Sequence, residues 1–439
     1  NTKLTSNTDN IIVEAGQSGS VSGEVVVSSG QTISVSTGAT TGQGGVDSLK
    51  VYKTFMPPVG RTVNRPTDVK PGMVFYNKDF KTIEFWDGNF WKQVDNTTRS
   101  TRAIICGGSN SSNPYLSTID TVNISTKGNA TKFGDMQNAV YAPSAFASET
   151  RGIIAGGKPS GGTIDVIDYV TLASEGDGID FGNLQVAMVH NAACSSSTRG
   201  VTLGNYSQSN VMNYVQISTV GDALDFGDIT SIQVSQAAAS SPTRAIFSGG
   251  YTAPHQYDMV TIASKGNAVR FGDMASIRAR HDGCSNGTRA VFGGGRSGGA
   301  FTVVGRLETI TIASEGNGVE FGTLSKINRN MLASASSKTR GLFAGGYDPN
   351  TSPTNSNVID FITIATLGNA KDFGDLLAAT SDFGGTGFSS PTRGVVAGGG
   401  GITTIQYVQF RTLGNAVDFG DLTAGNQYGA GASNGHGGL

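Results

Sequence analysis

The sequence predicts an all-β protein whose main part is a propeller of seven repeated units, and three observations predict it. A Thr-Arg pair recurs with its arginine at positions 102, 151, 199, 244, 289, 340 and 393. A Phe-Gly pair recurs with its phenylalanine at positions 133, 181, 226, 271, 321, 373 and 419. Apolar runs end in double glycine, as at Gly156-Gly157. A period of about 50 residues with such runs is typical of propeller blades rather than of helical solenoids.

Each repeat predicts four strands. The first is rich in Ala and Ser and precedes Thr-Arg, and the second is the apolar run into Gly-Gly. A third apolar strand follows a loop, and a fourth ends at Phe-Gly. Between strands three and four stands Gly with Asn or Asp, as at Gly266-Asn267, which a tight turn with positive φ favours.

The ring is expected to close through a shared sheet. Residues 95–100, before the first Thr-Arg, are polar and predict no first strand. Residues 432–437 parallel residues 284–289, which belong to a first strand and its turn. Residues of about 427–436 are therefore predicted to pair with Ala103 to Cys106, which protects both edges.

Two segments precede the predicted propeller, which spans residues 96–439. Residues 1–48 are rich in Ser, Thr and Gly and lack large apolar side chains, so they predict a β-rich attachment segment that packs on another chain. A flexible tail is the alternative. Residues 49–95 hold both tryptophans, Trp86 and Trp91, around Asp87-Gly88, a strong hairpin signal. They predict a small β module with an aromatic core.

Composition excludes several classes of protein. The net charge is −2, so no electrostatic argument supports nucleic-acid binding. No apolar run is long enough to predict membrane insertion. The three cysteines lack the spacing of a metal site, and we expect them to be small buried residues. No cofactor or metal is expected.

The loops between Gly-Gly and strand three are the candidate binding surface. The distance from each phenylalanine to the next arginine is 18 to 20 residues, whereas the distance from arginine to phenylalanine varies from 26 to 33. Variable loops on a rigid scaffold commonly bind ligands. The candidate ligand-binding residues on this rim are Tyr115, Tyr251, His255, Tyr257, Arg296, Arg306 and Tyr347. Ordinary loop variation without a ligand is the alternative.

The repeated polar residues have a structural interpretation. A site needs a few converging groups rather than one per blade. We therefore expect the arginines to stack on a neighbour or to bond carbonyl groups. The aspartates of Phe-Gly-Asp are expected to bond nearby backbone N–H groups, with a calcium role as the alternative. None of the four histidines lies in a nucleophile or metal motif, so no catalytic residues are assigned.

Two parts of the chain resemble known families. The double glycine, four strands and period of the repeat resemble kelch repeats, although Phe of Phe-Gly-Asp replaces the usual Trp. The pattern Pro71-Gly72 to Tyr76-Asn77, then Asp87-Gly88 to Trp91, is similar to a module of bacteriophage tail fibres. The repeats are also similar to those of large virion proteins of phages. These resemblances imply a kelch-like propeller on a virion protein that is often trimeric.

The resulting expectation is a non-enzymatic phage virion protein, a tail fibre or adhesin at the particle surface. Its N-terminal region would contact other virion proteins and form a homotrimer, and its propeller loops would recognise a host glycan or outer-membrane protein. Two alternatives stay open: a capsid or tail decoration protein with a purely structural propeller, and a glycan-active propeller enzyme.

Overall fold

A computed structural model describes residues 57–78, 82–86, 88, 91–94, 101–190, 192–203, 210–232, 236–250, 255–297, 302–350, 352–380 and 386–435. The chain forms two compact units, Asn1–Asn96 and Thr97–Leu439. The predicted attachment segment, residues 1–48, lies outside the described residues. Each unit is described by itself.

The first unit contains one mixed sheet. Its strands lie in the order β1 (Val59–Gly60), β2 (Val74–Asn77), β3 (Thr82–Trp86) and β4 (Trp91–Val94), with one 3-10 turn, η1 (Thr62–Asn64). The β3–β4 hairpin pairs Trp86 with Trp91, whose rings lie 5.8 Å apart. Buried Glu84 accepts two hydrogen bonds from Arg65, at 2.8 and 2.6 Å. The expected hairpin and aromatic core are both present.

The second unit consists of four-stranded antiparallel sheets, seven in the described residues. The first combines β32 (Ala430–Ser433), β5 (Arg102–Cys106), β6 (Leu116–Asn123) and β7 (Thr131–Val140). The second holds β8 (Ser144–Ala147), β9 (Arg151–Ala155), β10 (Val166–Thr171) and β11 (Ile179–Asn183). The third holds β12 (Ala192–Ser195), β13 (Arg199–Leu203), β14 (Val211–Gln216) and β15 (Leu224–Asp228).

The other four sheets follow the same order. The fourth holds β16 (Ala237–Ser240), β17 (Arg244–Ser248), β18 (Gln256–Thr261) and β19 (Val269–Asp273). The fifth holds β20 (Asp282–Ser285), β21 (Arg289–Gly293), β22 (Arg306–Thr311) and β23 (Val319–Thr323). The sixth holds β24 (Ala333–Ser336), β25 (Arg340–Ala344), β26 (Ser356–Thr363) and β27 (Lys371–Thr380). The seventh holds β28 (Thr386–Ser389), β29 (Arg393–Ala397), β30 (Ile402–Gln409) and β31 (Val417–Asn426).

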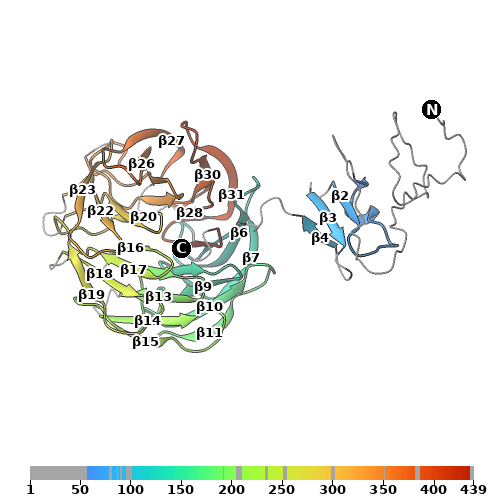
Figure 1. The fold of residues 1–439 in the computed structure, drawn as a ribbon, viewed down its shortest axis with the longest axis horizontal. Coiled ribbons are helices and arrows are strands. Elements are labelled where there is room, and N and C mark those ends of the chain that lie inside the picture. Colours follow the sequence, from blue (N-terminus) through green and yellow to red (C-terminus); the bar gives the residue numbers. More distant parts are fainter. Residues whose placement is uncertain are drawn as a thin grey trace, which may run out of the picture. The chain divides into compact units, whose positions relative to one another are not determined.

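The sheets stand around a common axis in a β-propeller-like ring. Figure 1 shows β16, β20 and β28 toward the centre and β15, β19 and β23 at the periphery. Each first strand packs on the first strand of the next sheet, and β32 packs on both β28 and β8. β32 pairs with β5 so that Ala432 faces Ile104 and Ala430 faces Cys106. This sheet combines one C-terminal strand with three N-terminal strands, as the repeat spacing predicts.

Apolar cores lie between neighbouring sheets. One joins the first and seventh sheets through Ile105, Val122, Val395 and Phe419, all buried. The repeated phenylalanine explains part of this packing. Where β10 pairs with β11, Ile167 lies opposite Gly182 and Asp168 lies opposite Asp180, so Phe181 of β11 is the extra residue of a β-bulge. The bulge recurs in all seven sheets, which accounts for the Phe-Gly repeat.

The repeated arginines fasten each sheet to the next, as their number in the sequence predicts. Arg199 donates from Nη1 to the carbonyl of Ile262, at 2.8 Å, in the following sheet. Arg393 does the same to Ile124, at 2.7 Å, across the junction where the ring closes. The guanidinium of Arg199 also lies 4.6 Å from the ring centre of Tyr214 in its own sheet. The arginines are therefore structural.

The Gly-Asn pair has a different role from the one expected. Gly266 has φ of 150°, but Asn267 is not among the residues with positive φ. Instead, Asn267 Oδ1 accepts a hydrogen bond from the backbone N–H of Asp228 in the preceding sheet, at 3.0 Å. The aspartates of Phe-Gly-Asp were expected to accept hydrogen bonds from nearby backbone N–H groups through their side chains. At Asp228 the backbone N–H is instead the donor, to the side chain of Asn267. The side chain of Asp273 pairs with Arg270, and that of Asp421 accepts from Thr403 Oγ1 at 3.0 Å.

Candidate binding surface at the channel mouth

Small side chains of the first strands line a central cavity of about 270 Å³. Its serines are already bonded between sheets. Ser285 Oγ donates to the carbonyl of Ser240 at 2.7 Å, and Ser336 Oγ donates to Ser285 at 3.0 Å. Ser389 and Ser433 continue the series, each donating to the preceding sheet at 3.0 Å. The serines of the cavity wall are therefore part of the scaffold.

One end of the channel carries a ring of residues in the left-handed conformation. They stand two residues before a first strand, with φ between 50° and 59°: Ala142, His190, Arg280, Met331 and Tyr428. Their backbones link neighbouring sheets. The N–H of Ala142 donates to Tyr428 O at 2.9 Å, and that of His190 donates to Ala142 O at 3.1 Å. The N–H of Met331 donates to Arg280 O at 2.9 Å.

An aromatic cluster occupies part of this ring. The Tyr141 ring centre lies 5.6 Å from those of both His190 and Tyr428. The His190 and Tyr428 rings are 5.9 Å apart, on either side of the small Ala142. Tyr115 joins the cluster from the loop after Gly107-Gly108, with its ring 6.2 Å from that of Tyr141. All four side chains are partly exposed, so the cluster is not sealed in the core.

Basic side chains accompany the aromatic cluster. Burial lowers the pKa of His190 to about 4, and the charges of Arg280 and Lys158 add to this effect. His190 is therefore neutral at physiological pH. Lys158 is bonded through its backbone to Tyr141, at 3.1 and 3.0 Å, which places it beside the aromatic cluster. We call Tyr141, Lys158, His190, Arg280 and Tyr428 the mouth surface.

Three of the candidates predicted from sequence lie at this end of the channel. Tyr115 touches the aromatic cluster. The backbone of Arg296 bonds Ala279, next to Arg280, at 2.9 and 3.0 Å. The backbone of Tyr347 bonds Asn330, next to Met331, at 2.8 and 3.1 Å. The loops after Gly-Gly and the links between sheets therefore share one rim.

Two of the other candidates, Tyr257 and Arg306, lie in strand three rather than in the loop before it. Tyr257 is wrong as a loop residue, because β18 begins at Gln256 and the Tyr257 side chain is fully buried. Arg306 begins β22 and pairs with Glu320 at 3.3 Å and Glu308 at 3.5 Å. His255 is half-buried, and its carbonyl accepts from Met274 N–H at 2.9 Å. Tyr251 lies outside the described residues.

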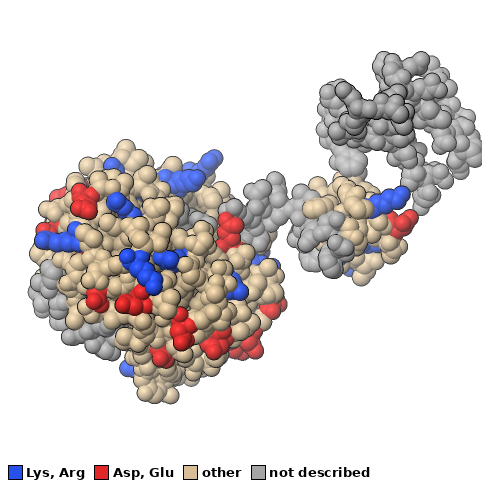
Figure 2. Space-filling view, turned by 60° about the horizontal axis from the view of Figure 1, so that its bottom comes forward, with Lys and Arg blue, Asp and Glu red and all other residues tan. Residues whose placement is uncertain are grey.

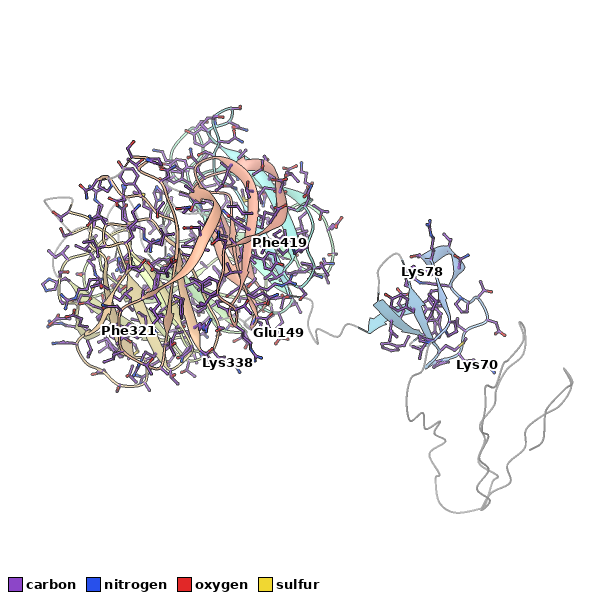
Figure 3. The ribbon with its side chains drawn as sticks, turned by 90° about the horizontal axis from the view of Figure 1, so that it is seen from above. Lys70, Lys78, Glu149, Phe321, Lys338 and Phe419 are labelled. Atoms are coloured by element: carbon purple, nitrogen blue, oxygen red, sulfur yellow. The ribbon has the colours of Figure 1, made fainter. Side chains whose placement is uncertain are left out.

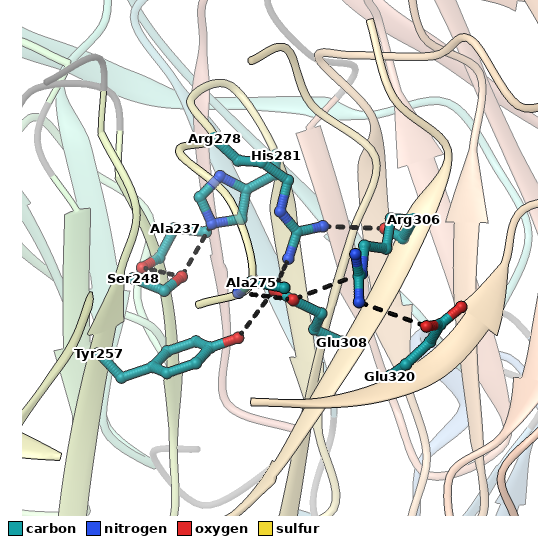
Figure 4. A network of polar contacts seen from close by, with 9 residues as sticks. All are labelled: Ala237, Ser248, Tyr257, Ala275, Arg278, His281, Arg306, Glu308 and Glu320. Carbon is teal, nitrogen blue, oxygen red and sulfur yellow. Dashed lines mark hydrogen bonds and ion pairs between the residues drawn. The ribbon is translucent and has the colours of Figure 1, made fainter. Parts of the chain in front are cut away.

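Tyr257 belongs to a buried polar network between the fourth and fifth sheets. Figure 4 shows Tyr257, Arg278 and Arg306 converging on Glu308. The Tyr257 hydroxyl donates to Glu308 Oε2 at 3.3 Å, and Arg278 forms an ion pair with the same carboxylate. Both charged side chains have no exposed surface. Because no part of this pair is accessible, we assign it to packing rather than to a site.

A matching polar residue stands inside strand three of every sheet: Asp120, Asp168, Asn213, Asp258, Glu308, Asp360 and Gln406. Its side chain accepts a hydrogen bond from the residue four positions after the repeated phenylalanine of the preceding sheet. Asn213 Oδ1, for example, accepts from Gln185 N–H at 2.9 Å, and Glu308 accepts from Ala275 N–H at 2.9 Å. These buried acceptors hold strand four of one sheet to strand three of the next.

A comparison of loop lengths in the sequence did not find His190, Arg280 and Tyr428. These residues lie in the segment of nearly constant length between Phe-Gly and Thr-Arg, each nine positions after its phenylalanine. The signal is a change of residue type at a fixed position. Aligning the repeats on phenylalanine reveals it, because the same position holds Ala142 in the first sheet.

Neither metal nor membrane chemistry is indicated in the part of the chain that the structure describes. No group of three or more His, Cys, Asp or Glu is placed to bind a metal ion there. Within the same residues, no helix has the length and hydropathy needed to span a membrane. Both basic and acidic side chains appear on the face that Figure 2 shows, in line with a net charge of −2.

No family model matches this chain, and no curated protein matches it. Among solved structures, one similar chain is described as "Structure of YjhT". It is 10% identical, with a TM-score of 0.47, over 57% of this chain and 88% of that one. A similarity at this level says nothing about what this chain binds.

Proposed function

We propose that this chain is a non-enzymatic bacteriophage virion protein of the tail-fibre or adhesin type. In this proposal the ring is a seven-bladed, kelch-like propeller that presents one rim to the host cell surface. The N-terminal region attaches the propeller to other virion proteins and assembles it, as a trimer, at the particle surface. The resemblance of residues 71–91 to tail-fibre modules supports the virion assignment.

The distribution of variation supports host recognition. The contacts between sheets repeat with nearly the same residues, as the arginine bonds of Arg199 and Arg393 illustrate. Side chains differ between repeats at one rim, where Tyr115, Arg296 and Tyr347 gather around the channel mouth. A scaffold held constant under one varied surface fits a binding protein. Binding rather than catalysis is further supported by the use of buried acidic groups, such as Glu308, in sheet-to-sheet bonds.

Attachment of the fluorescently labelled full chain to a panel of bacterial cells tests the proposal. Replacing Tyr115, Arg296 and Tyr347 with Ala should reduce attachment at least about tenfold, since aromatic and Arg side chains dominate binding energies. Thermal stability should change little, because surface side chains each contribute within about 0.5 kcal/mol.

A matched variant controls for general surface effects. Glu149 and Lys338, labelled in Figure 3, lie in the turns between strands one and two, at the opposite rim. Changing both to Ala should leave attachment unaltered. If the Tyr115, Arg296 and Tyr347 variant attaches as well as the unsubstituted chain, host recognition by this rim is wrong and a decoration role is favoured.

A further inference from the structure

The left-handed residues at the channel mouth pose a specific question. At a φ near 55°, glycine is the least strained residue, and this chain uses 63 glycines. Yet the ring carries His190 at 55°, Arg280 at 55° and Tyr428 at 59°. The backbone bonds between sheets need only the N–H and C=O groups, which glycine also supplies. Scaffold geometry therefore does not explain the large side chains.

Strain of this kind persists where a side chain has a use. The side chains form a mixed aromatic and basic surface. Three aromatic rings lie within 6 Å of each other, and Lys158 is bonded to Tyr141 through its backbone. Arg280 stands at the same left-handed position as His190, two sheets further around the ring. Aromatic rings offer apolar faces to the C–H groups of a pyranose ring, and phenol and imidazole groups bond its hydroxyls. Arg280 and Lys158 add the charge that a carboxylate requires.

We propose that the mouth surface binds a carboxylated saccharide, an inference that names the ligand class of the proposed host-recognition rim and rests on that function. The sugar ring packs on Tyr141, His190 and Tyr428, and its carboxylate pairs with Arg280 and Lys158. His190 stays neutral between pH 6 and pH 8, so its ring presents an uncharged face to the sugar throughout that range.

Glycine substitutions distinguish a structural role of these large side chains from a role in binding sugar. His190→Gly and Tyr428→Gly remove the side chains and relieve the left-handed strain, so melting temperature should stay the same or rise. Binding of oligogalacturonide by the full chain, measured calorimetrically, should fall at least about tenfold in each variant. Ala142→Gly is the matched control, because it changes the same backbone position without removing an aromatic ring. Its affinity should equal that of the unsubstituted chain.

A neutral oligogalactoside of equal length tests the charge requirement. It should bind at least about tenfold more weakly than the acidic ligand, and Arg280→Gln should remove most of this difference. Equal binding of both ligands would overturn the assignment to carboxylated sugars. So would a chain that binds neither ligand, or glycine variants that keep full affinity for oligogalacturonide.

Cell attachment is read separately from sugar binding. If the glycine variants lose oligogalacturonide but the chain attaches to no bacterial cell, the sugar site stands and the host-recognition proposal fails. If cells are bound equally by the unsubstituted chain and by both glycine variants, and oligogalacturonide is not bound, the sugar site fails while host recognition stands.

Discussion

Single side chains in this protein divide into those that bond the next sheet and those that face the channel mouth. Asp258 illustrates the first kind. It lies in β18 with 1% of its surface exposed and accepts hydrogen bonds from Thr230 and Gln256, at 2.7 and 3.0 Å. Burial is the largest influence on its pKa, which is raised to about 6. The charged carboxylate is therefore less favourable in the fold than in the unfolded chain.

This raised pKa predicts the sign of a pH effect. Folded Asp258 binds its proton more tightly than unfolded Asp258, so stability falls as pH rises from about 4 to about 6. Asp258→Asn should remove this loss and raise the free energy of unfolding at pH 7 by about 2 kcal/mol. Asn213 occupies the matching position in the preceding sheet, so an amide fits there.

Urea unfolding between pH 4 and pH 8 measures the effect. The variant should show a flatter stability curve than the unsubstituted chain over the acidic part of this range. Asp273→Asn is the control, since Asp273 is exposed, and Arg270 lowers its pKa instead. An unchanged slope between pH 4 and pH 6 in the Asp258→Asn protein would contradict the predicted role of burial.

For single residues, the sequence predicted whether a side chain is structural or buried better than it predicted the hydrogen-bond partner. The arginines were correctly interpreted as structural, because seven copies of a group cannot converge on one site. The cysteines were correctly expected to be buried, and burial raises the pKa of Cys194 to about 12. The partner of Asn267 was missed, because its acceptor role spans 39 positions to Asp228 and no local pattern encodes it.

Individual elements depend on ion pairs and acceptors that cross from sheet to sheet. Arg278 follows β19 and pairs with Glu308 of β22, with both side chains fully buried. Arg329 follows β23 and pairs in the same way with Asp360 of β26. The arginines also donate to backbone carbonyls, as Arg278 does to Arg306 at 2.9 Å. In these two junctions a cation replaces the apolar residues that Val140 and Met188 supply elsewhere.

Removing one partner of such an ion pair should lower the free energy of unfolding more than removing both charges. Arg278→Met removes the fully buried cation of Glu308 and leaves Arg306, 3.5 Å away, as its remaining cation, so stability should fall by about 3 kcal/mol. The double variant Arg278→Met, Glu308→Gln keeps an acceptor for Ala275 N–H and should recover a large part of this loss. Denaturant unfolding of the three proteins checks the order. A double variant no more stable than Arg278→Met would refute it.

Element boundaries limited the prediction of the site. The repeat placed the first and second strands correctly, because these have four and five residues in every sheet. The fourth strands were expected to end at Phe-Gly, but they continue to Asp273 in β19 and to Val140 in β7. The repeat also misplaced Tyr257, which reads as a loop residue only if β18 begins later than Gln256. The mouth surface could not be predicted from the sequence for another reason. Tyr141, His190 and Tyr428 come from links after three different sheets and meet only when the ring closes.

The whole ring depends on the junction where β32 enters the first sheet. Ala430 to Ser433 pair with Ala103 to Cys106, and Asn434 bonds the backbone of Arg102 through both its side chain and its N–H, at 2.8 and 3.1 Å. β32 also packs between β28 and β8 in the inner ring. Tyr428, which precedes it, belongs to the mouth surface, so ring closure and the proposed binding surface share one segment.

Deleting residues 429–439 tests this dependence while leaving β31 complete. The loss uncovers the edge of β5 and the buried side chain of Ile104, and the missing strand bonds should lower stability by roughly 4 kcal/mol. An exposed apolar edge strand promotes association, so aggregation should increase in light scattering. Deleting only residues 436–439 is the control and should leave both properties unchanged, because β32 ends at Ser433. A soluble 429–439 deletion with an unaltered melting temperature would show that the ring does not rely on its shared sheet.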